Sequence, residues 1–279
     1  MEVLSCKRCI IGEGPIWNAF NKKLYYVNAF DDEVCTYDPA TGEETVQKYD
    51  FSVGAFGFAK DGRMLVSCTD GAFILYPDGS RVAMAPHAPI NCNDAKVGPD
   101  GRFYVGTQSR KRMGLGEEVD GCLYSIDGEG QVRMLLTGLR LSNGFDWSVD
   151  EKRFYHTDSD THTIREYDFD KVEGSLTYPG REVKVPGVDG FTVGMDDRLY
   201  VACWGKRHIV VVDSRTMTVV EEIPTPVRIP VSCNFMGEAM DRLVIVTASY
   251  REDLEKEPLA GMTFITEVPT TGRLPYLFG

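Results

Sequence analysis

The sequence lacks the features that mark several large classes of protein. No apolar run approaches the roughly 20 residues that a helix needs to span a bilayer, so we expect no membrane partner. The N-terminus has neither a long apolar stretch nor a small-residue cleavage site, so we expect no signal peptide. The net charge is −12, with no dense block of Lys and Arg. A nucleic-acid binder needs a basic footprint, so we expect no nucleic-acid partner.

Histidine is also scarce, with four residues among 279, whereas cysteine occurs eight times. Cys6 and Cys9 form a CxxC pair, but no second pair follows to complete a zinc site. On a strand, an offset of three places two side chains on opposite faces, so we interpret this pair as edge or core thiols. Free cysteines in a chain without a signal peptide are typical of a reducing compartment. We therefore predict a cytoplasmic protein.

A repeat runs through the whole chain. Six times, a charged turn is followed by a short β-rich run, such as FYVGT after Pro-Asp-Gly-Arg. The first apolar residues of these runs are spaced by 40, 39, 51, 45 and 44 positions; they are Leu24, Met64, Phe103, Phe154, Leu199 and Leu243. A period of about 40 to 50 residues with several strands per unit is typical of a β-propeller.

Each unit of the repeat holds more than one strand. A short apolar segment such as GPIW or GFDW precedes each run, and a strand-like segment follows it, at 33–38, 71–77, 121–127, 163–170, 208–213 and 261–268. A fourth strand fits in the polar gap before the next unit. We therefore predict an all-β fold: a six-bladed β-propeller of four-stranded antiparallel blades around a central channel, in one domain over residues 1–279. Residues 2–10 should pair with the C-terminal blade, because an exposed edge would otherwise remain.

Oxygen-bearing side chains recur at one position of this repeat. Glu13, Asn93, Asn143 and Asp189 each lie 10 or 11 residues before the first apolar residue of a run. In a propeller, that position brings them together at one end of the channel. Two carboxylates close together repel each other, and a divalent cation removes that cost. A set without Cys or His suits Ca²⁺, Mg²⁺ or Mn²⁺, although any one of these residues taken alone also fits an ordinary turn.

Five stretches resemble the motifs of the SMP-30/gluconolactonase/regucalcin-like family. They are IGEGPIW (11–17), NCNDAKVGPDGRFYVGT (91–107), LSNGFDWSVDEKRFYHTDS (141–159), VDGFTVGMDDRLYVACW (188–204) and VSCNF (231–235). They span nearly the whole chain in order. The resemblance implies a six-bladed propeller with one catalytic divalent cation (Ca, Zn, Mg or Mn) and hydrolysis of a small-molecule lactone, in many members a sugar-acid lactone.

Residue roles follow from the matching motifs. The resemblance implies that Glu13, Asn143 and Asp189 bind the metal and that Asn93 contacts substrate. It also implies that Asp189 acts as general base, although a water ionised by the cation itself is a competing source of the nucleophile.

Two positions depart from the family pattern or align with it loosely. Where sugar lactonases of the regucalcin type carry a sugar-binding arginine, this chain has Asn91. We expect Asn91, with Asn93, to orient substrate through hydrogen bonds. The family's acidic lid residue falls in the loop 108–120, where Glu117 or Glu118 fits.

The sequence also allows two other functions and leaves the roles of four further polar residues to be considered. The same fold hydrolyses organophosphates or non-sugar lactones in relatives, and the loss of the arginine favours that alternative. A non-enzymatic calcium-binding propeller is a third possibility. His156 and Asp158 alternate onto one strand face, but the chain has no GxSxG nucleophile motif to complete a triad. Asp94 and Asp146 are expected to satisfy backbone groups at strand ends.

Overall fold

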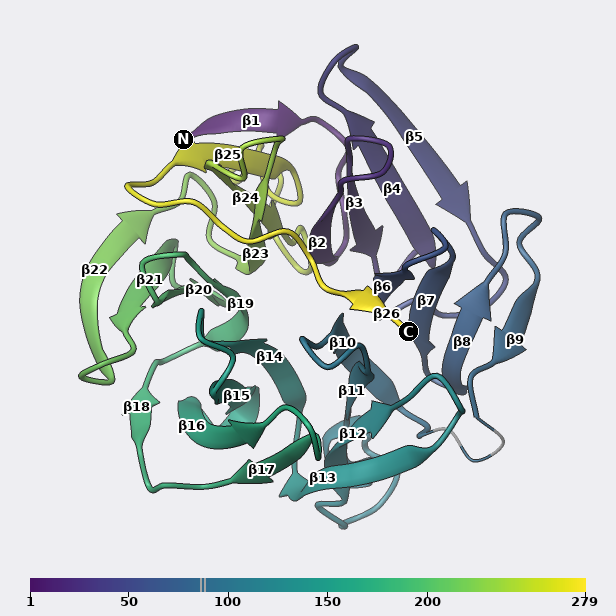
Figure 1. Cartoon of the computed structure of the whole chain (residues 1–279). Coiled ribbons are helices and arrows are strands. Elements are labelled where there is room, and N and C mark those ends of the chain that lie inside the picture. The colour runs from purple at the N-terminus through teal and green to yellow at the C-terminus, as the bar shows by residue number, and fades with distance from the viewer. Residues whose placement is uncertain (86, 88) are drawn as a thin grey trace. The chain divides into compact units, whose positions relative to one another are not determined.

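Six small antiparallel sheets make up the fold (Figure 1). The computed structural model describes residues 1–85, 87 and 89–279. Within those residues every sheet contains strands that are consecutive in the sequence and paired with their neighbours. This arrangement confirms the predicted all-β, six-bladed β-propeller with antiparallel blades.

The strands correspond closely to the segments that the repeat predicted. The first strands of the six sheets are β2 (Gly12–Asn18), β6 (Ala55–Ala59), β10 (Cys92–Val97), β14 (Ser142–Trp147), β19 (Val188–Val193) and β23 (Pro230–Met236). The second strands carry the charged-turn runs and are β3 (Lys23–Asn28), β7 (Met64–Cys68), β11 (Phe103–Thr107), β15 (Arg153–Asp158), β20 (Arg198–Cys203) and β24 (Arg242–Thr247).

The third and fourth strands complete the sheets. The third strands are β4 (Glu33–Asp38), β8 (Gly71–Leu75), β12 (Gly121–Ile126), β16 (Thr163–Asp170), β21 (His208–Asp213) and β25 (Thr263–Glu267). The fourth are β5 (Glu43–Lys48), β9 (Arg81–Ala83), β13 (Val132–Leu139), β17 (Ser175–Thr177), β22 (Thr218–Pro224) and β1 (Glu2–Ser5), and β18 (Glu182–Lys184) also pairs with β16. Two short helical segments, α1 (Arg110–Met113) and η1 (Ser159–Thr161), lie in loops.

The charged turns before the second strands have a local cause. In the turn between β10 and β11, Gly101 adopts a φ of 74°, which an L side chain rarely does. Asp100 accepts hydrogen bonds from the Arg102 side chain at 2.6 Å and from the Tyr104 hydroxyl at 2.8 Å. The turn residues therefore bind the strand that follows them, and the repeated Asp-Gly-Arg signal marks this hairpin connection.

The chain divides into two compact units with three sheets each. The first unit contains residues 1–50 and 183–275, and the second contains residues 51–182 and 276–279. The single domain over 1–279 stays a prediction. No helix among the described residues combines the length and the apolar content that crossing a bilayer would take.

In the first unit, the N-terminal strand completes the last sheet. β1 pairs antiparallel with β25, with Glu2 opposite Ile265 (Figure 1). This confirms the prediction that the N-terminal residues cover the edge of the C-terminal blade. The core of the unit consists of large side chains that are almost completely buried, among them Trp17, Leu24, Tyr200, Phe235 and Leu243.

In the second unit, aromatic side chains form the core and the C-terminus adds a strand. Tyr104 packs edge-to-face on Trp147 with ring centroids 4.8 Å apart, and Phe154 lies 5.1 Å from the same indole. The last strand, β26 (Leu277–Phe278), pairs in parallel with β6 (Figure 1). The repeat did not predict β26, because a two-residue strand carries no periodicity.

The junction of β1 with the first sheet gives a test of the fold. The Ser5 hydroxyl lies 3.1 Å from the Tyr26 hydroxyl, and both groups hydrogen-bond to Glu44. Ser5→Ala should lower the free energy of unfolding by about 1–2 kcal/mol, because it weakens a buried polar network. Urea denaturation measures this change. Ser80→Ala, in an exposed turn, is the control, and equal stability of the two variants would contradict the prediction.

Candidate functional site

The four repeat-position residues occupy equivalent places in their sheets. Glu13, Asn93, Asn143 and Asp189 are each the second residue of a first strand, in β2, β10, β14 and β19. The first strands begin two residues before predicted apolar segments such as GPIW and GFDW, so these residues lie inside the strands and not just before them. Glu13 and Asp189 belong to the first unit, and Asn93 and Asn143 belong to the second.

Each of these residues lies at an irregularity in strand pairing. Pairing between β2 and β3 shifts by one residue after Glu13, and the corresponding shift follows Asn143 in β14. In β10 and β19 the shifted segments contain Asn93 and Asp189. A β-bulge bends the strand and re-aims a side chain, and bulges are frequent next to active sites. The bulges therefore separate these four side chains from the regular alternation of their strands.

In the first unit, burial and close packing surround the two carboxylates. Asp189 is only 6% exposed, whereas Glu13 is half-buried. A Cβ on Gly190 would lie 2.2 Å from the Ser232 hydroxyl, so β19 approaches β23 too closely for any larger residue. Gly14 follows Glu13 in a left-handed conformation with φ of 50°, which only glycine adopts at little cost.

In the second unit, hydrogen bonds from two neighbouring sheets fix Asn93. The Ser67 hydroxyl of β7 donates to the Asn93 backbone carbonyl at 2.9 Å. The Asn93 side-chain amide donates from Nδ2 to the Ser142 carbonyl at 3.1 Å. Because Nδ2 faces Ser142, the other end of the amide, Oδ1, is turned toward Gln108, whose Nε2 donates to it at 3.4 Å. Asn93 thus presents its oxygen in one orientation.

Gln108 is a residue that the sequence reasoning missed. Its backbone N–H donates to the Asn91 carbonyl at 2.9 Å, and its side chain contacts Asn93. Asn91 itself has a left-handed backbone with φ of 59°. The contacts of Gln108 thus join three amide residues at one strand end. Its position one residue beyond β11 was the only available signal.

Ser142 and His156 do not form a catalytic triad with Asp158. The Ser142 hydroxyl and His156 Nε2 share a hydrogen bond at 2.8 Å. Both residues are almost completely buried, so substrate cannot reach the hydroxyl. Asp158 accepts instead from two backbone amides, those of Arg140 and Leu141. The pair therefore fixes the start of β14, next to Asn143.

Asp94 and Asp146 behave as the sequence reasoning expected. Each carboxylate accepts a hydrogen bond from the backbone N–H of the following residue at 2.8 Å. Asp146 also forms an ion pair with Lys96 at 3.3 Å. Burial raises the pKa of Asp94 to about 6, although the Lys96 charge acts in the opposite direction. These contacts give both residues a structural role inside their strands.

Glu117 lies on the surface of the loop that contains α1. Its side chain is 91% exposed and forms an ion pair with Lys111 at 3.1 Å. A second ion pair, between Arg110 and Asp120 at 2.7 Å, holds the two ends of the loop together. The part of Glu117 in substrate binding stays a prediction.

A metal site at the repeat position would depend on amide as well as carboxylate oxygens. Across residues 1–85, 87 and 89–279, no three His, Cys, Asp or Glu side chains come together in a way that could hold a metal ion. The predicted set does not need such a group, because Asn143 supplies an amide oxygen. The donors of Glu13, Asn143 and Asp189 fit a hard cation such as Ca²⁺, Mg²⁺ or Mn²⁺ and fit Zn²⁺ less well.

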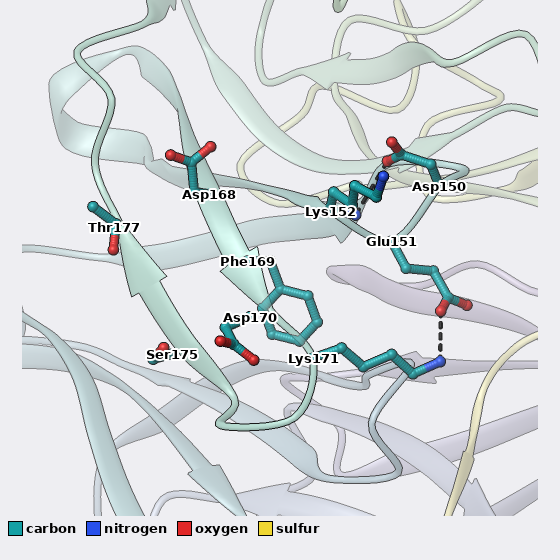
Figure 2. Close-up of a pocket in the computed structure, with 9 residues that line it drawn as sticks. All are labelled: Asp150, Glu151, Lys152, Asp168, Phe169, Asp170, Lys171, Ser175 and Thr177. Carbon is teal, nitrogen blue, oxygen red and sulfur yellow. Dashed lines mark hydrogen bonds and ion pairs between the residues drawn. The ribbon is translucent and has the colours of Figure 1, made fainter.

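A pocket of about 530 Å³ in the second unit lies away from Asn143, beyond the opposite end of β14 (Figure 2). Its lining includes the turn after β14, whereas Asn143 lies near the start of that strand. Glu151 pairs with Lys171 at the pocket edge, and Asp170 accepts from the backbone of Val172. These carboxylates stabilise turns, so we assign the pocket no binding role. Its lining residues are Asp150, Glu151, Lys152, Asp168, Phe169, Asp170, Lys171, Ser175 and Thr177.

Comparison with known proteins identifies a family and a fold. The sequence profile of the family described as "SMP-30/Gluconolactonase/LRE-like region" matches residues 11–249. Regucalcin from Gallus gallus is 28% identical, over 100% of this chain and 98% of its own length. A pentonolactonase from Haloferax volcanii is also 28% identical, over 95% of this chain and 93% of its own length.

A solved structure supports the same architecture. The structure of a regucalcin from Agrobacterium tumefaciens, described as a calcium-binding protein, matches with a TM-score of 0.89. The match covers 99% of this chain and 96% of the other, at 22% identity. This likeness concerns the fold.

The tight contact between β11 and β14 leads to a stability prediction. A Cβ on Gly106 would lie 2.4 Å from the Ser142 hydroxyl and 3.0 Å from the Ser142 carbonyl. Gly106→Ala should therefore lower the free energy of unfolding by about 1–3 kcal/mol, as overpacking does. The matched control is Gly128→Ala, whose Cβ would meet nothing within 4 Å. Urea denaturation of both variants checks this, and equal effects would rule out a close approach at Gly106.

The buried His156 predicts a pH dependence of stability. Burial lowers the pKa of His156 to about 3, and the nearby Arg165 charge lowers it further. Unfolding restores the ordinary pKa of about 6.5, so the unfolded chain binds a proton that the folded chain does not. This histidine should therefore cost about 2 kcal/mol of stability as the pH falls from 7 to 5. His156→Gln should reduce the measured loss by that amount, whereas an unchanged loss would contradict the assignment.

Proposed function

The chain belongs to the SMP-30/gluconolactonase/LRE-like family, and from that premise we propose that it is a metal-dependent hydrolase that opens a sugar-acid lactone. One observation carries the proposal furthest. Four oxygen-bearing residues occupy the same place in four first strands, each at a pairing irregularity. The names of the relatives, which include a pentonolactonase, support lactone hydrolysis.

We assign the metal to Glu13, Asn143 and Asp189. Two carboxylates and one amide oxygen would hold one divalent cation, with Ca²⁺, Mg²⁺ and Mn²⁺ favoured over Zn²⁺ by the donor chemistry. Asp189 is almost completely buried, and a bound cation would offset the cost of a carboxylate charge at such a position. When bound, such a cation polarises the lactone carbonyl and makes water more acidic.

The residues of the chain would supply orientation and proton transfer. The Asp189 carboxylate takes a proton from the attacking water, whose oxygen bonds to the carbonyl carbon. The bond between that carbon and the ring oxygen then breaks, and Asp189 returns its proton to the ring oxygen, which becomes the hydroxyl of a hydroxy acid. Asn93 and Asn91 orient the substrate by hydrogen bonds, and Glu117 closes over it from the loop.

Asn91 favours one alternative substrate class. A neutral amide there offers fewer hydrogen-bond donors for sugar hydroxyls than an arginine does. A non-sugar lactone or an organophosphate is therefore the second candidate. A calcium-binding protein without enzymatic activity is the third, since a structural relative is described as calcium-binding.

We also propose that the protein works in the cytoplasm. The eight cysteines are free thiols, and seven of them are buried. Free cysteines in this number suit a reducing compartment.

Substitution of the two carboxylates tests the proposed site. Asp189→Ala and Glu13→Gln should each reduce metal-dependent kcat/KM for an aldonolactone by about 100-fold or more, because they remove metal and base functions. Glu129→Gln, in an exposed turn, is the control for a lost surface charge. Circular dichroism verifies folding. Full activity in both site variants would refute the assignment.

A substrate panel separates the three candidates. Aldonolactones and one aryl phosphotriester are assayed with and without EDTA, and metal analysis of the untreated protein identifies the bound cation. Turnover of aldonolactones that EDTA abolishes supports the proposal. Turnover of the phosphotriester alone favours the second candidate, and binding of calcium without any turnover favours the third.

A further inference from the structure

Three aromatic side chains, one exposed and two partly buried, gather at the ends of strands in the first unit. Ile11, Trp204 and Tyr250 are partly buried and pack on a small buried cluster of Ile229, Val231 and Ala248. Phe30 packs edge-to-face on Tyr250, with ring centroids 5.5 Å apart. We call Ile11, Phe30, Trp204 and Tyr250 the apolar shelf. Phe30 is 60% exposed, so the shelf opens to solvent.

Backbone hydrogen bonds place the shelf beside the two predicted metal-binding carboxylates of the same unit. Ala29, next to Phe30, donates to the Ile11 carbonyl at 2.9 Å, and Tyr250 donates to Ile10 at 3.1 Å. These bonds hold the backbone at Ala29 and Tyr250 against the chain just before Glu13.

On the other side of the shelf, Trp204 lies next to the strand of Asp189. Its backbone N–H donates to the Gly187 carbonyl at 2.7 Å, at the strand end where Cys203 pairs with Val188. The shelf therefore contacts the chain beside both carboxylates.

One cation lies against the shelf. The Arg251 guanidinium lies 4.9 Å from the centre of the Tyr250 ring, a cation–π distance. The shelf thus combines aromatic surface with one cation and presents no acidic group of its own. Binding sites for small molecules are lined mainly by apolar and aromatic side chains with a few polar groups. A shelf of this kind binds a neutral apolar or aromatic group better than a polyol.

We propose that the apolar shelf is a subsite for an apolar, preferably aromatic, substituent of the lactone. The inference rests on the proposed lactone hydrolysis and takes up the second candidate substrate, a non-sugar lactone, which here carries such a substituent away from its carbonyl. Continuity with Glu13 and Asp189 favours a substrate group over a second protein as the occupant.

Two lactones that differ only in this group test the subsite. The probes are δ-valerolactone and its phenyl-substituted derivative, and the readout is the ratio of their kcat/KM values. In the unaltered protein we expect kcat/KM for the phenyl lactone to be about 10-fold or more higher than for δ-valerolactone. Burial of an aromatic ring gives at least that gain in affinity.

The variant Phe30→Ala should reduce this preference by about 5-fold or more, because it removes the most exposed ring of the shelf. The matched control is Phe20→Ala. Phe20 is equally exposed, at 58%, but lies in the turn after the opposite end of β2. Its substitution should keep the preference. An unaltered ratio in Phe30→Ala, or an equal fall in both variants, would overturn the subsite.

A binding measurement keeps the subsite testable if neither lactone is hydrolysed. Trp204 lies on the shelf, whereas Trp17 and Trp147 are buried, so intrinsic fluorescence reports on occupancy. Saturable quenching by the phenyl lactone that Phe30→Ala weakens would support the shelf while the proposed hydrolysis fails. The absence of saturable quenching would overturn it. Sedimentation velocity would also overturn it by showing a dimer that Phe30→Ala dissociates.

Discussion

The close approach of strands from neighbouring sheets is the constraint on which the candidate residues depend. Gly190 faces Ser232 in the first unit, and Gly106 faces Ser142 in the second, each too closely for a Cβ. With the sheets this close, backbone carbonyls of one strand meet side chains of the next, as the bond from Asn93 to Ser142 illustrates. The polar residues at the strand starts are therefore held by packing, and a bulge at each strand turns the side chain out of the regular alternation.

Most of the fold could be predicted because its information is local. Three of the third strands, at 33–38, 163–170 and 208–213, coincide with the predicted segments to the residue. Period-2 alternation, Asp-Gly turns and a repeat of about 40 to 50 residues are all signals of short range along the chain. The same repeat indicated Glu13 and its three counterparts, since equivalent positions in equivalent sheets differ only in their side chains. What they bind remains a prediction, because repetition says where residues lie and not which atoms they contact.

The features that were missed depend on side-chain contacts between neighbouring strands of one sheet. Gln108 has no motif of its own, and its hydrogen bonds to Asn93 in β10 and to Asn91 in the loop before β10 give it a place in the candidate site. The bond between Ser142 and His156 had the same character: alternation placed His156 correctly, but its partner lay on the adjacent strand, and burial decided that the pair is structural. Side-chain partners across strands follow from register, and a bulge changes register by one residue.

The candidate residues of the two units differ in chemistry, and each set by itself bears on the substrate. In the second unit, Asn91, Asn93 and Gln108 are amides, which hydrogen-bond without a net charge. In the first unit, the two carboxylates belong to the same unit as the aromatic shelf. A sugar-acid lactone would leave Phe30 exposed to water, whereas a lactone with an apolar substituent would cover it. Asn91 offers sugar hydroxyls fewer hydrogen-bond donors than an arginine would, so Asn91 and the shelf favour the same substrate. Because burial of an aromatic ring stabilises a complex more than one added hydrogen bond does, the shelf is the stronger of the two arguments.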